Sequence, residues 1–250
     1  MSIPKIIHYC WFGGKELPKS AKKCIRSWQK YMPDYEIKRW DESNFDINLC
    51  KFTTEAYSKG KYAFVSDVAR FWILNKYGGV YFDTDVEVIR PFDDIVNEGP
   101  FMGLELPYNA SSFAHEIGIA PGLGMGAVPE MPFYGEMLDF YSKSSFINDD
   151  GSLNLTPIGK YVSRLLCAHG LENKKGIQTV ADINIYPNDY FCPKSITNGK
   201  ITLTQNSHSI HHFDASWLPR GKRMKIIMSV RYPKLTKKLL AIKSILSGKK

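Results

Sequence analysis

Two aspartates within residues 78–87 have the type and spacing needed to hold a cation. The segment reads Gly-Gly-Val-Tyr-Phe-Asp-Thr-Asp-Val-Glu, and from Val80 onward apolar and polar residues largely alternate. Because successive side chains of a β-strand point to opposite faces, the pattern predicts one strand with Asp83 and Asp85 on the same face. Their spacing of about 6.5–7 Å suits one carboxylate on a divalent cation, with the other acting through water or holding a neighbouring group. We interpret the pair as a seat for a metal–diphosphate, with a solvated edge strand as the alternative.

A second pair of charged residues precedes the first on a predicted helix. Residues 62–77 carry apolar side chains at helical spacing and end at Gly-Gly, which predicts a helix that leads directly into the acidic strand. Asp67 and Arg70 are three residues apart and therefore share one helix face. They form either a local ion pair of little energetic weight or a joint acceptor and forked donor for sugar hydroxyls or a phosphate.

Two further features stand far from the acidic strand in the sequence. Trp11 follows a short predicted strand and precedes Gly13-Gly14. Ligands of α/β sheets bind beyond the carboxyl ends of strands, where an indole can stack on a base, although a core tryptophan fits the pattern too. His211-His212 lies near the other end of the chain, and a neutral imidazole from this pair would complete a metal site begun by Asp85. A histidine pair with a purely structural role is the alternative.

The elements that must position these residues follow an α/β order. Apolar runs and breaker residues predict strands over 3–10 and 35–40, helices over 18–31 and 62–77, and the acidic strand after the second helix. This order predicts an α/β fold with a parallel-cored sheet. Residues 99–132 are rich in glycine and proline and are expected to be loop-rich. The remaining expected elements are helices over 131–141 and 157–169 and short strands over 185–190 and 201–203.

Composition is that of an ordinary globular protein, with 44 % hydrophobic and 23 % charged residues among 250. Five scattered cysteines without a CxxC pair indicate neither a disulfide framework nor a zinc site and favour a reducing cytoplasm. The N-terminus lacks a signal-peptide pattern, and no apolar run is long enough to predict a membrane-spanning helix.

The net charge of +8 is unevenly distributed. Residues 220–250 hold eleven Lys and Arg and no acid, so the 33 basic residues leave 22 for the rest of the chain, against 25 acidic ones. A mildly acidic body argues against nucleic-acid binding, which requires basic residues over a folded face. We therefore expect two regions, a catalytic domain over 1–219 and a basic tail over 220–250.

The ordered set of motifs resembles glycosyltransferase family 32, the DXD sugar transferases that include bacterial capsular polysaccharide enzymes and yeast α-mannosyltransferases, with clostridial glucosylating toxins as distant relatives. The resemblance covers nearly the whole chain except the basic tail. It is carried by four segments: Ile3-Pro-Lys-Ile-Ile-His-Tyr-Cys-Trp-Phe-Gly-Gly, Ser66-Asp67-Val-Ala-Arg70, Tyr77-Gly-Gly-Val-Tyr-Phe-Asp-Thr-Asp85, and His211-His-Phe-Asp-Ala-Ser-Trp217.

This resemblance implies a GT-A fold, a Rossmann-like nucleotide-sugar-binding mixed sheet flanked by helices, with Mn²⁺ or Mg²⁺ as cofactor and a retaining transfer. It implies a base-stacking role for Trp11 and donor-sugar contacts for Asp67 and Arg70. The remaining implied roles are Tyr81 and Asp83 near ribose and metal, Asp85 as a direct metal ligand, Ser216 and Trp217 closing over the diphosphate, and His212, in preference to His211, as a further metal ligand.

The predicted function is transfer of a hexose from a nucleotide diphosphate sugar to a surface polysaccharide or lipid-linked oligosaccharide. UDP-galactose or UDP-glucose is the favoured donor, and GDP-mannose is the alternative. A nucleotide-sugar hydrolase and a non-catalytic carbohydrate-binding module are the competing hypotheses. Apolar residues at helical spacing in the tail, interleaved with lysines, predict an amphipathic helix on an anionic membrane surface, so we expect a cytoplasmic protein, peripheral on the inner face of the plasma membrane.

Overall fold

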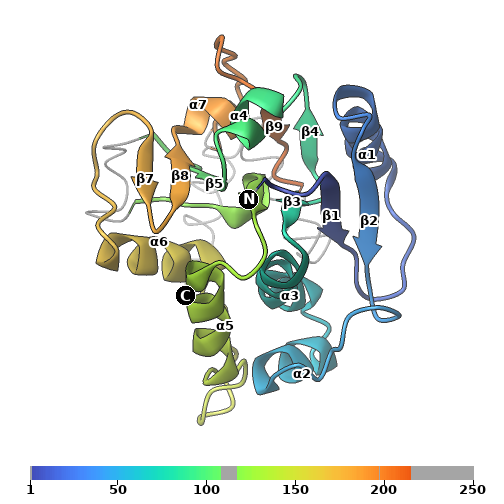
Figure 1. Ribbon diagram of the computed structural model, residues 1–250. Helices are drawn as coiled ribbons and strands as arrows, with labels where there is room; N and C mark the ends of the chain where they lie inside the picture. Colours follow the sequence, from blue (N-terminus) through green and yellow to red (C-terminus); the bar gives the residue numbers. More distant parts are fainter. Residues whose placement is uncertain (1, 108–116, 197, 215–250) are drawn as a thin grey trace, which may run out of the picture.

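The computed structural model describes residues 2–107, 117–196 and 198–214 of the chain, and its centre is a mixed seven-stranded sheet (Figure 1). The strand order is β2-β1-β3-β6-β5-β8-β7, and a separate two-stranded sheet pairs β4 with β9. The predicted fold class, an α/β fold with a mixed sheet flanked by helices, is confirmed.

The first part of the chain builds the parallel side of the sheet. Strand β1 pairs in parallel with both β2 and β3, as the alternation of strands and helices predicted. Its elements are β1 (Ile6–Cys10), α1 (Lys19–Tyr31), β2 (Glu36–Trp40), α2 (Lys51–Ser58), α3 (Tyr62–Tyr77) and β3 (Gly79–Tyr81).

The rest of the described chain adds shorter elements to the same sheet. Strand β6 runs antiparallel to both β3 and β5, and β8 joins parallel to β5. These elements are β4 (Val86–Val88), α4 (Asp93–Asn97), β5 (Phe101–Gly103), η1 (Pro121–Leu123), β6 (Met125–Ala127), α5 (Pro132–Ser142), α6 (Ile158–Ala168), β7 (Gln178–Val180), β8 (Ile183–Tyr186), α7 (Asn188–Phe191) and β9 (Ser209–His211).

Helices bury both faces of the sheet, and each face has its own apolar cluster. One cluster holds side chains of α2, α3, α5 and α6, and the other holds side chains of α1, α4, α7 and β4. Figure 1 shows where these elements lie around the sheet. Successive residues of β3 divide between them, with Val80 in the second cluster and Tyr81 in the first. Helix α1 also fixes β4, because the Trp28 Nε1–H donates to Val86 O at 2.8 Å and the Ser27 hydroxyl accepts from the Val88 N–H at 2.9 Å.

Most long elements appear where the sequence predicts them. The strands expected over 3–10 and 35–40 and the helices expected over 18–31, 62–77, 131–141 and 157–169 are confirmed to within a few residues. In α1, Pro18 stands immediately before the first helical residue, where a missing N–H costs no hydrogen bond. No helix among the described residues is long and apolar enough to cross a membrane.

Two predictions of strands are wrong in their bounds or extent. The strand expected over 185–190 ends at Tyr186, because Pro187 leads into α7. The strand expected over 201–203 is reduced to one bridge between Ile201 and Lys194. The segment 99–132 is loop-rich among its described residues, as expected, and it also contributes two strands of three residues, β5 and β6, to the sheet. Its glycines serve packing as much as turning, since a Cβ added to Gly126 would lie 2.3 Å from the ring of Phe101.

The acidic segment itself is not one strand, which corrects the geometry expected from its alternation. Strand β3 ends at Tyr81, a turn follows, and β4 begins at Val86 in the second sheet. The alternation survives because Phe82 and Val86 are both fully buried on either side of the turn. The two aspartates therefore occupy a turn between sheets. The basic tail, with its predicted amphipathic helix, lies outside the described residues.

Candidate active site

The turn between β3 and β4 brings the two aspartates together. The Asp83 N–H donates to Gly122 O at 3.1 Å, and the Val86 N–H donates back to Asp83 O at 3.0 Å, which closes the turn. Asp83, Asp85 and His211 each offer a ligand atom, and these three atoms all lie within 4.8 Å of one another. Because the two aspartates lie in a turn, both carboxylates are close enough to share one ion. The predicted straight strand would have kept them too far apart.

Strand β9 supplies the third side chain through its pairing with β4. Val86 stands opposite His211 in this antiparallel pair, and the His211 Nε2 lies 3.1 Å from Asp85 Oδ1. Backbone groups complete the contacts of Asp85: the His212 N–H donates to its main-chain oxygen at 2.9 Å, and the Asp214 N–H donates to Oδ2 at 2.8 Å. Residues more than 120 positions apart in the sequence are joined here.

The charges of Asp85 and His211 support each other. Burial would raise the pKa of the Asp85 carboxyl, but the charge of His211 and the hydrogen bonds from His211 and the Asp214 N–H outweigh it and lower that pKa to about 2. Burial would lower the pKa of His211, yet the facing Asp85 carboxylate reverses this and raises it. Asp85 is therefore an ionised carboxylate at neutral pH.

Asp83 belongs to a buried ionic cluster centred on Arg70. The Arg70 Nη2 lies 3.0 Å from Asp67 Oδ1 and 3.2 Å from Asp83 Oδ1. The Nε–H of the same side chain donates to Ser66 O at 3.1 Å, and the guanidinium lies 4.8 Å from the centre of the Tyr81 ring. The Tyr81 hydroxyl donates to Asp83 Oδ1 at 3.0 Å. The sequence pairing of Asp67 with Arg70 is thus present, and it extends to Asp83.

Burial sets the protonation of this cluster. Asp67 is 9 % and Arg70 4 % exposed. Burial, only partly offset by the Arg70 charge, raises the pKa of the Asp67 carboxyl to about 7. Burial would lower the pKa of Arg70, but the neighbouring acidic groups, Asp83 first, keep it raised, so the guanidinium stays charged. Both side chains stand behind Asp83 and support it from the protein interior.

His211 and His212 occupy different surroundings, and these decide which of them lies close enough to bind the same ion as the two aspartates. The sequence resemblance favoured His212. Adjacent side chains of a strand point to opposite faces. His212 accordingly faces Glu87, with Nε2 2.7 Å from Oε2, and Lys23 pairs with the same carboxylate at 2.8 Å. The structure therefore brings His211, and not His212, to the two aspartates.

The other predicted residues stand as follows. Trp11 directly follows β1, is partly exposed, and donates its indole N–H to Lys15 O at 2.6 Å. The preceding residue, Cys10, is close enough to Arg70 and Asp83 for their charges to act on its thiol, so the end of β1 borders the site. Ser216 and Trp217 lie outside the described residues, and their roles remain predictions.

Sequence analysis missed two residues that border the site. A Cβ added to Gly122 of η1 would lie 2.0 Å from Asp83 Oδ2 and 3.2 Å from Arg70 Nη1, so only glycine leaves room for that carboxylate. Glu105 follows β5, and the charges of Glu105 and His211 act on each other, while burial raises the pKa of the Glu105 carboxyl. No local sequence pattern marks either residue, because each is brought to the site by the part of the sheet that contains β5 and β6, whose pairing joins residues distant in the sequence.

The donor set fits a divalent cation. Two carboxylates and an imidazole are ligands that Mn²⁺ and Mg²⁺ accept, within the limits of their preference for oxygen. The Nδ1 atom of His211 is buried and has no hydrogen-bond partner within the described residues. This atom is not the one that faces Asp85, which is Nε2. The geometry accommodates an ion beside His211, Asp83 and Asp85 because their ligand atoms lie within 4.8 Å of one another.

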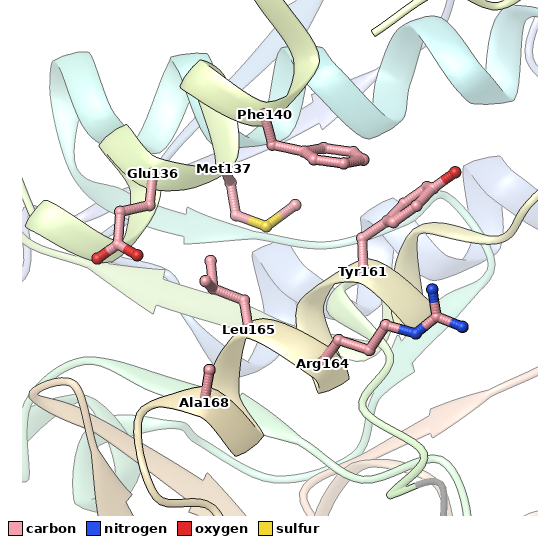
Figure 2. A pocket seen from close by; sticks show the side chains of 7 residues that line it. All are labelled: Glu136, Met137, Phe140, Tyr161, Arg164, Leu165 and Ala168. Carbon is pink, nitrogen blue, oxygen red and sulfur yellow. The ribbon is translucent and has the colours of Figure 1, made fainter. Parts of the chain in front are cut away.

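A separate apolar hollow lies between α5 and α6 (Figure 2). It has a volume of about 340 Å³ and shares no residue with the aspartate site. The rings of Phe140 and Tyr161 meet at one end with their centres 4.5 Å apart. The other lining residues are Glu136, Met137, Arg164, Leu165 and Ala168. Its lining residues do not include two carboxylates and an imidazole, the set of groups found at the aspartate turn.

Comparison with known proteins finds one matching family model, described as "Glycosyltransferase sugar-binding region containing DXD motif", over residues 18–102. An uncharacterized glycosyltransferase of Acanthamoeba polyphaga mimivirus is 28 % identical over 243 residues, covering 92 % of this chain and 90 % of that protein. Inositol phosphoceramide mannosyltransferase 3 of Schizosaccharomyces pombe is 34 % identical over 104 residues, which cover 38 % of this chain and only 28 % of that protein.

Among solved structures, a glycosyltransferase involved in the glycosylation of the major capsid of PBCV-1 aligns with a TM-score of 0.50 at 11 % identity, covering 90 % of this chain and all of that one. At this identity the likeness concerns the fold alone. The chain thus spans nearly the whole length of the mimivirus glycosyltransferase but well under half of the yeast mannosyltransferase.

Proposed function

We propose that the chain, which matches the model of DXD-containing glycosyltransferases and resembles family 32, transfers a hexose, with retention, from a nucleotide diphosphate sugar to a glycan acceptor. The observation that carries the proposal is the close approach of Asp83, Asp85 and His211, whose ligand atoms lie within 4.8 Å of one another. When bound there, a divalent ion such as Mn²⁺ or Mg²⁺ stabilises the negative charge that develops on the departing diphosphate.

The residues of the chain supply binding, charge and orientation. Asp85 is held ionised by His211 and by the Asp214 N–H, so it is ready as a ligand. Arg70 pairs with Asp83 and Asp67 from the interior and so holds Asp83 in place at the proposed ion position. The partly exposed indole of Trp11, at the carboxyl end of β1, is proposed to stack on the nucleotide base.

Donor and acceptor follow from the resemblance. We propose a UDP-hexose, UDP-galactose or UDP-glucose, with GDP-mannose as the alternative that the names of the yeast relatives favour. The proposed acceptor is a surface polysaccharide or a lipid-linked oligosaccharide, met by a cytoplasmic enzyme at the inner face of the plasma membrane. Ser216 and Trp217 are proposed to close over the diphosphate.

The decisive test is release of nucleoside diphosphate from a panel of nucleotide sugars in the presence of Mn²⁺. We expect turnover with one class of donor, loss of turnover in EDTA, and stimulation by an added glycan acceptor. Donor consumption at a rate that no acceptor changes would instead identify a nucleotide-sugar hydrolase. Glycan binding that needs neither nucleotide nor Asp85 would identify a carbohydrate-binding module.

A matched pair of histidine variants tests the metal site directly. His211→Ala removes an imidazole beside the aspartates, while His212→Ala removes the neighbouring imidazole that pairs with Glu87. Loss of a group that only orients a metal ligand costs about 10- to 100-fold in affinity. We therefore expect the first change, which removes a ligand, to weaken Mn²⁺ binding by at least this much and the second to leave it nearly unchanged. Equal losses in both variants, measured by titration calorimetry without nucleotide, would contradict the assignment of His211.

Membrane association is proposed separately, from the composition of residues 220–250. The eleven basic residues and apolar side chains of this tail suit an anionic bilayer. Sedimentation of the full chain and of a chain lacking residues 221–250 with anionic liposomes tests it. Binding that does not depend on the tail would remove the proposal without touching the transferase activity.

A further inference from the structure

The last residue of β9 and the three residues after it, residues 211–214, contact Asp85 from several sides, and we call this segment the β9 clasp. Its first side chain, His211, contacts Asp85 Oδ1. The N–H of His212 reaches the main-chain oxygen of Asp85 at 2.9 Å, and the N–H of Asp214 reaches Oδ2 at 2.8 Å. Two N–H groups that stand two residues apart therefore serve the same aspartate, and the chain must turn at the residue between them.

That residue, Phe213, has a left-handed backbone conformation. Its φ is +56°, a region that bulky side chains with a Cβ rarely enter because of steric clash. Strain of this kind persists only where the surroundings enforce it, and it concentrates at functional sites. Here the conformation carries the chain round so that the Asp214 N–H faces the Asp85 carboxylate.

The side chain of Phe213 acts on the same site from a different direction. Its ring centre lies 4.4 Å from that of His211, with the ring planes 64° apart. An edge-to-face contact of this kind restricts rotation of the imidazole. Phe213 also packs against the apolar cluster that includes β4, so the ring is itself held in place. The backbone of Phe213 therefore positions the Asp214 N–H, and its ring positions the His211 imidazole. Both of these groups contact Asp85.

We propose that Phe213 is a positioning residue for the metal site, which orients His211 through its ring and the Asp214 N–H through its left-handed backbone. The inference rests on the proposed function, since it concerns the same ion. Phe213 itself offers no ligand atom. Its effect is expected on metal affinity, by analogy with groups that orient metal ligands elsewhere, whose loss weakens binding about 10- to 100-fold.

Three substitutions separate the ring from the backbone. Phe213→Ala removes the ring and keeps a Cβ at a strained φ, so we expect about 10-fold weaker Mn²⁺ binding. Phe213→Gly removes the ring but adopts this φ without strain, so we expect a smaller loss. Phe213→Tyr keeps the ring and should bind Mn²⁺ within about twofold of the unchanged chain. Binding is measured by electron paramagnetic resonance of Mn²⁺ with the full chain and no nucleotide.

A matched control comes from the turn between β7 and β8. Ala181 has a φ of +50°, so Ala181→Gly relieves a similar strain away from the aspartates. We expect this variant to leave Mn²⁺ affinity unchanged while raising the melting temperature. A gain in melting temperature that is shared by Phe213→Gly would show that the strain at both positions is real.

The outcomes are distinct. Weaker Mn²⁺ binding in Phe213→Ala, with recovery in Phe213→Tyr, supports the positioning role. A Phe213→Ala variant that melts earlier but binds Mn²⁺ as the unchanged chain does would overturn it, because Phe213 would then be a packing residue only. If the unchanged chain binds no Mn²⁺, the metal role in the proposed function fails together with this inference.

Discussion

Asp83 and Asp85 stand two residues apart, yet different parts of the chain hold them. Asp83 is held by side chains of the first 81 residues, the Arg70 guanidinium at 3.2 Å and the Tyr81 hydroxyl at 3.0 Å. Asp85 is held by residues that follow 126 or more positions later, the His211 imidazole at 3.1 Å and the Asp214 N–H at 2.8 Å. The turn therefore joins the buried ionic cluster around Arg70 to the β9 clasp, residues 211–214.

This difference indicates how the two carboxylates divide their work. The Asp83 side chain is 30 % exposed and already neutralised by Arg70, whereas the Asp85 side chain is 17 % exposed and ionised against a histidine. Substitutions near α3 should displace Asp83 and lower the stability of the core. Substitutions near β9 should displace Asp85 and weaken metal binding.

The largest expected effect is on catalysis, through Asp85→Asn. We expect transfer to fall by about 10³-fold or more, equivalent to about 4 kcal/mol of transition-state stabilisation, because a neutral amide is a poor ligand. The fold should survive, since the amide oxygen still accepts the Asp214 N–H and the main-chain bond to His212 is untouched. Steady-state kinetics with far-ultraviolet circular dichroism measures both quantities.

Its control is Asp34→Asn, which changes a surface carboxylate whose side chain is 76 % exposed. That variant should keep full activity. Full turnover by a folded Asp85→Asn enzyme would remove the metal from the mechanism, and with it the distinction between the two aspartates.

The next effect is on stability, through Arg70→Met. Removal of this buried guanidinium leaves Asp67 and Asp83 without their shared counter-charge. Breaking a buried ion pair by removing one partner costs about 3–5 kcal/mol, and we expect the lower end because Asp83 is partly exposed to water. Urea unfolding followed by circular dichroism measures the loss.

Two further variants sharpen this measurement. Arg26→Met changes an exposed arginine of α1 and should alter the unfolding free energy by less than about 0.5 kcal/mol. The double change Asp67→Asn with Arg70→Met should lose less than the two single changes together, because the amide no longer needs a counter-charge. Simple additivity would contradict the view that Asp67 and Arg70 act as a pair.

Much of the Asp83 side was predictable from the sequence. Helix α3 follows from its apolar periodicity and its Gly-Gly end, and the spacing of Asp67 and Arg70 placed both on one face of it. Such local patterns depend on residues within one or two turns, so a single sequence carries them. The parallel order of β2, β1 and β3 follows from the same local elements.

The Asp85 side was not predictable in the same way. Which histidine faces the aspartates depends on the register of β4 against β9, a pairing between residues that are distant in the sequence. The alternation of residues 78–88 concealed the turn, because Phe82 and Val86 are buried in both readings. Gly122 gave no signal among several glycines, although its missing side chain makes room for Asp83.

Gly122→Ala tests whether Asp83 can be disturbed without touching Asp85. The added methyl group would stand 2.0 Å from Asp83 Oδ2, so the carboxylate must move. We expect transfer to fall by about 100-fold, equivalent to about 2.7 kcal/mol, and the unfolding free energy to fall by about 1–3 kcal/mol from overpacking. Kinetics and urea unfolding of the same preparation separate the two effects.

Gly135→Ala is the matched control, because a Cβ there meets nothing within 4 Å. Placed inside α5, it should keep full activity and add about 0.5–1 kcal/mol of stability. Unchanged kinetics in Gly122→Ala would mean that Asp83 tolerates displacement and that the metal depends on Asp85 and His211 alone.

The smallest effect concerns the scaffold behind Asp83. His8 of β1 accepts from the Trp40 indole N–H and donates to Gly78 O, both at 3.0 Å, so it links β1 to β2 and to the residue before β3. Burial, opposed in part by the Gly78 bond, lowers the pKa of this imidazole from 6.5 to about 4. The folded protein therefore holds a neutral His8, while the unfolded chain binds a proton below pH 6.5.

Stability from His8 is thus complete above pH 6.5 and is lost as the pH falls from 6.5 towards 4, at about 1.4 kcal/mol per pH unit. Between pH 7.5 and 5.5 we expect a loss of about 1.4 kcal/mol that His8→Gln, which has no titrating group, does not show. Urea unfolding at both pH values measures the difference between the two proteins. An identical pH dependence would mean that His8 accepts a proton within the fold, and that the strands beneath Asp83 are less rigidly joined than these hydrogen bonds indicate.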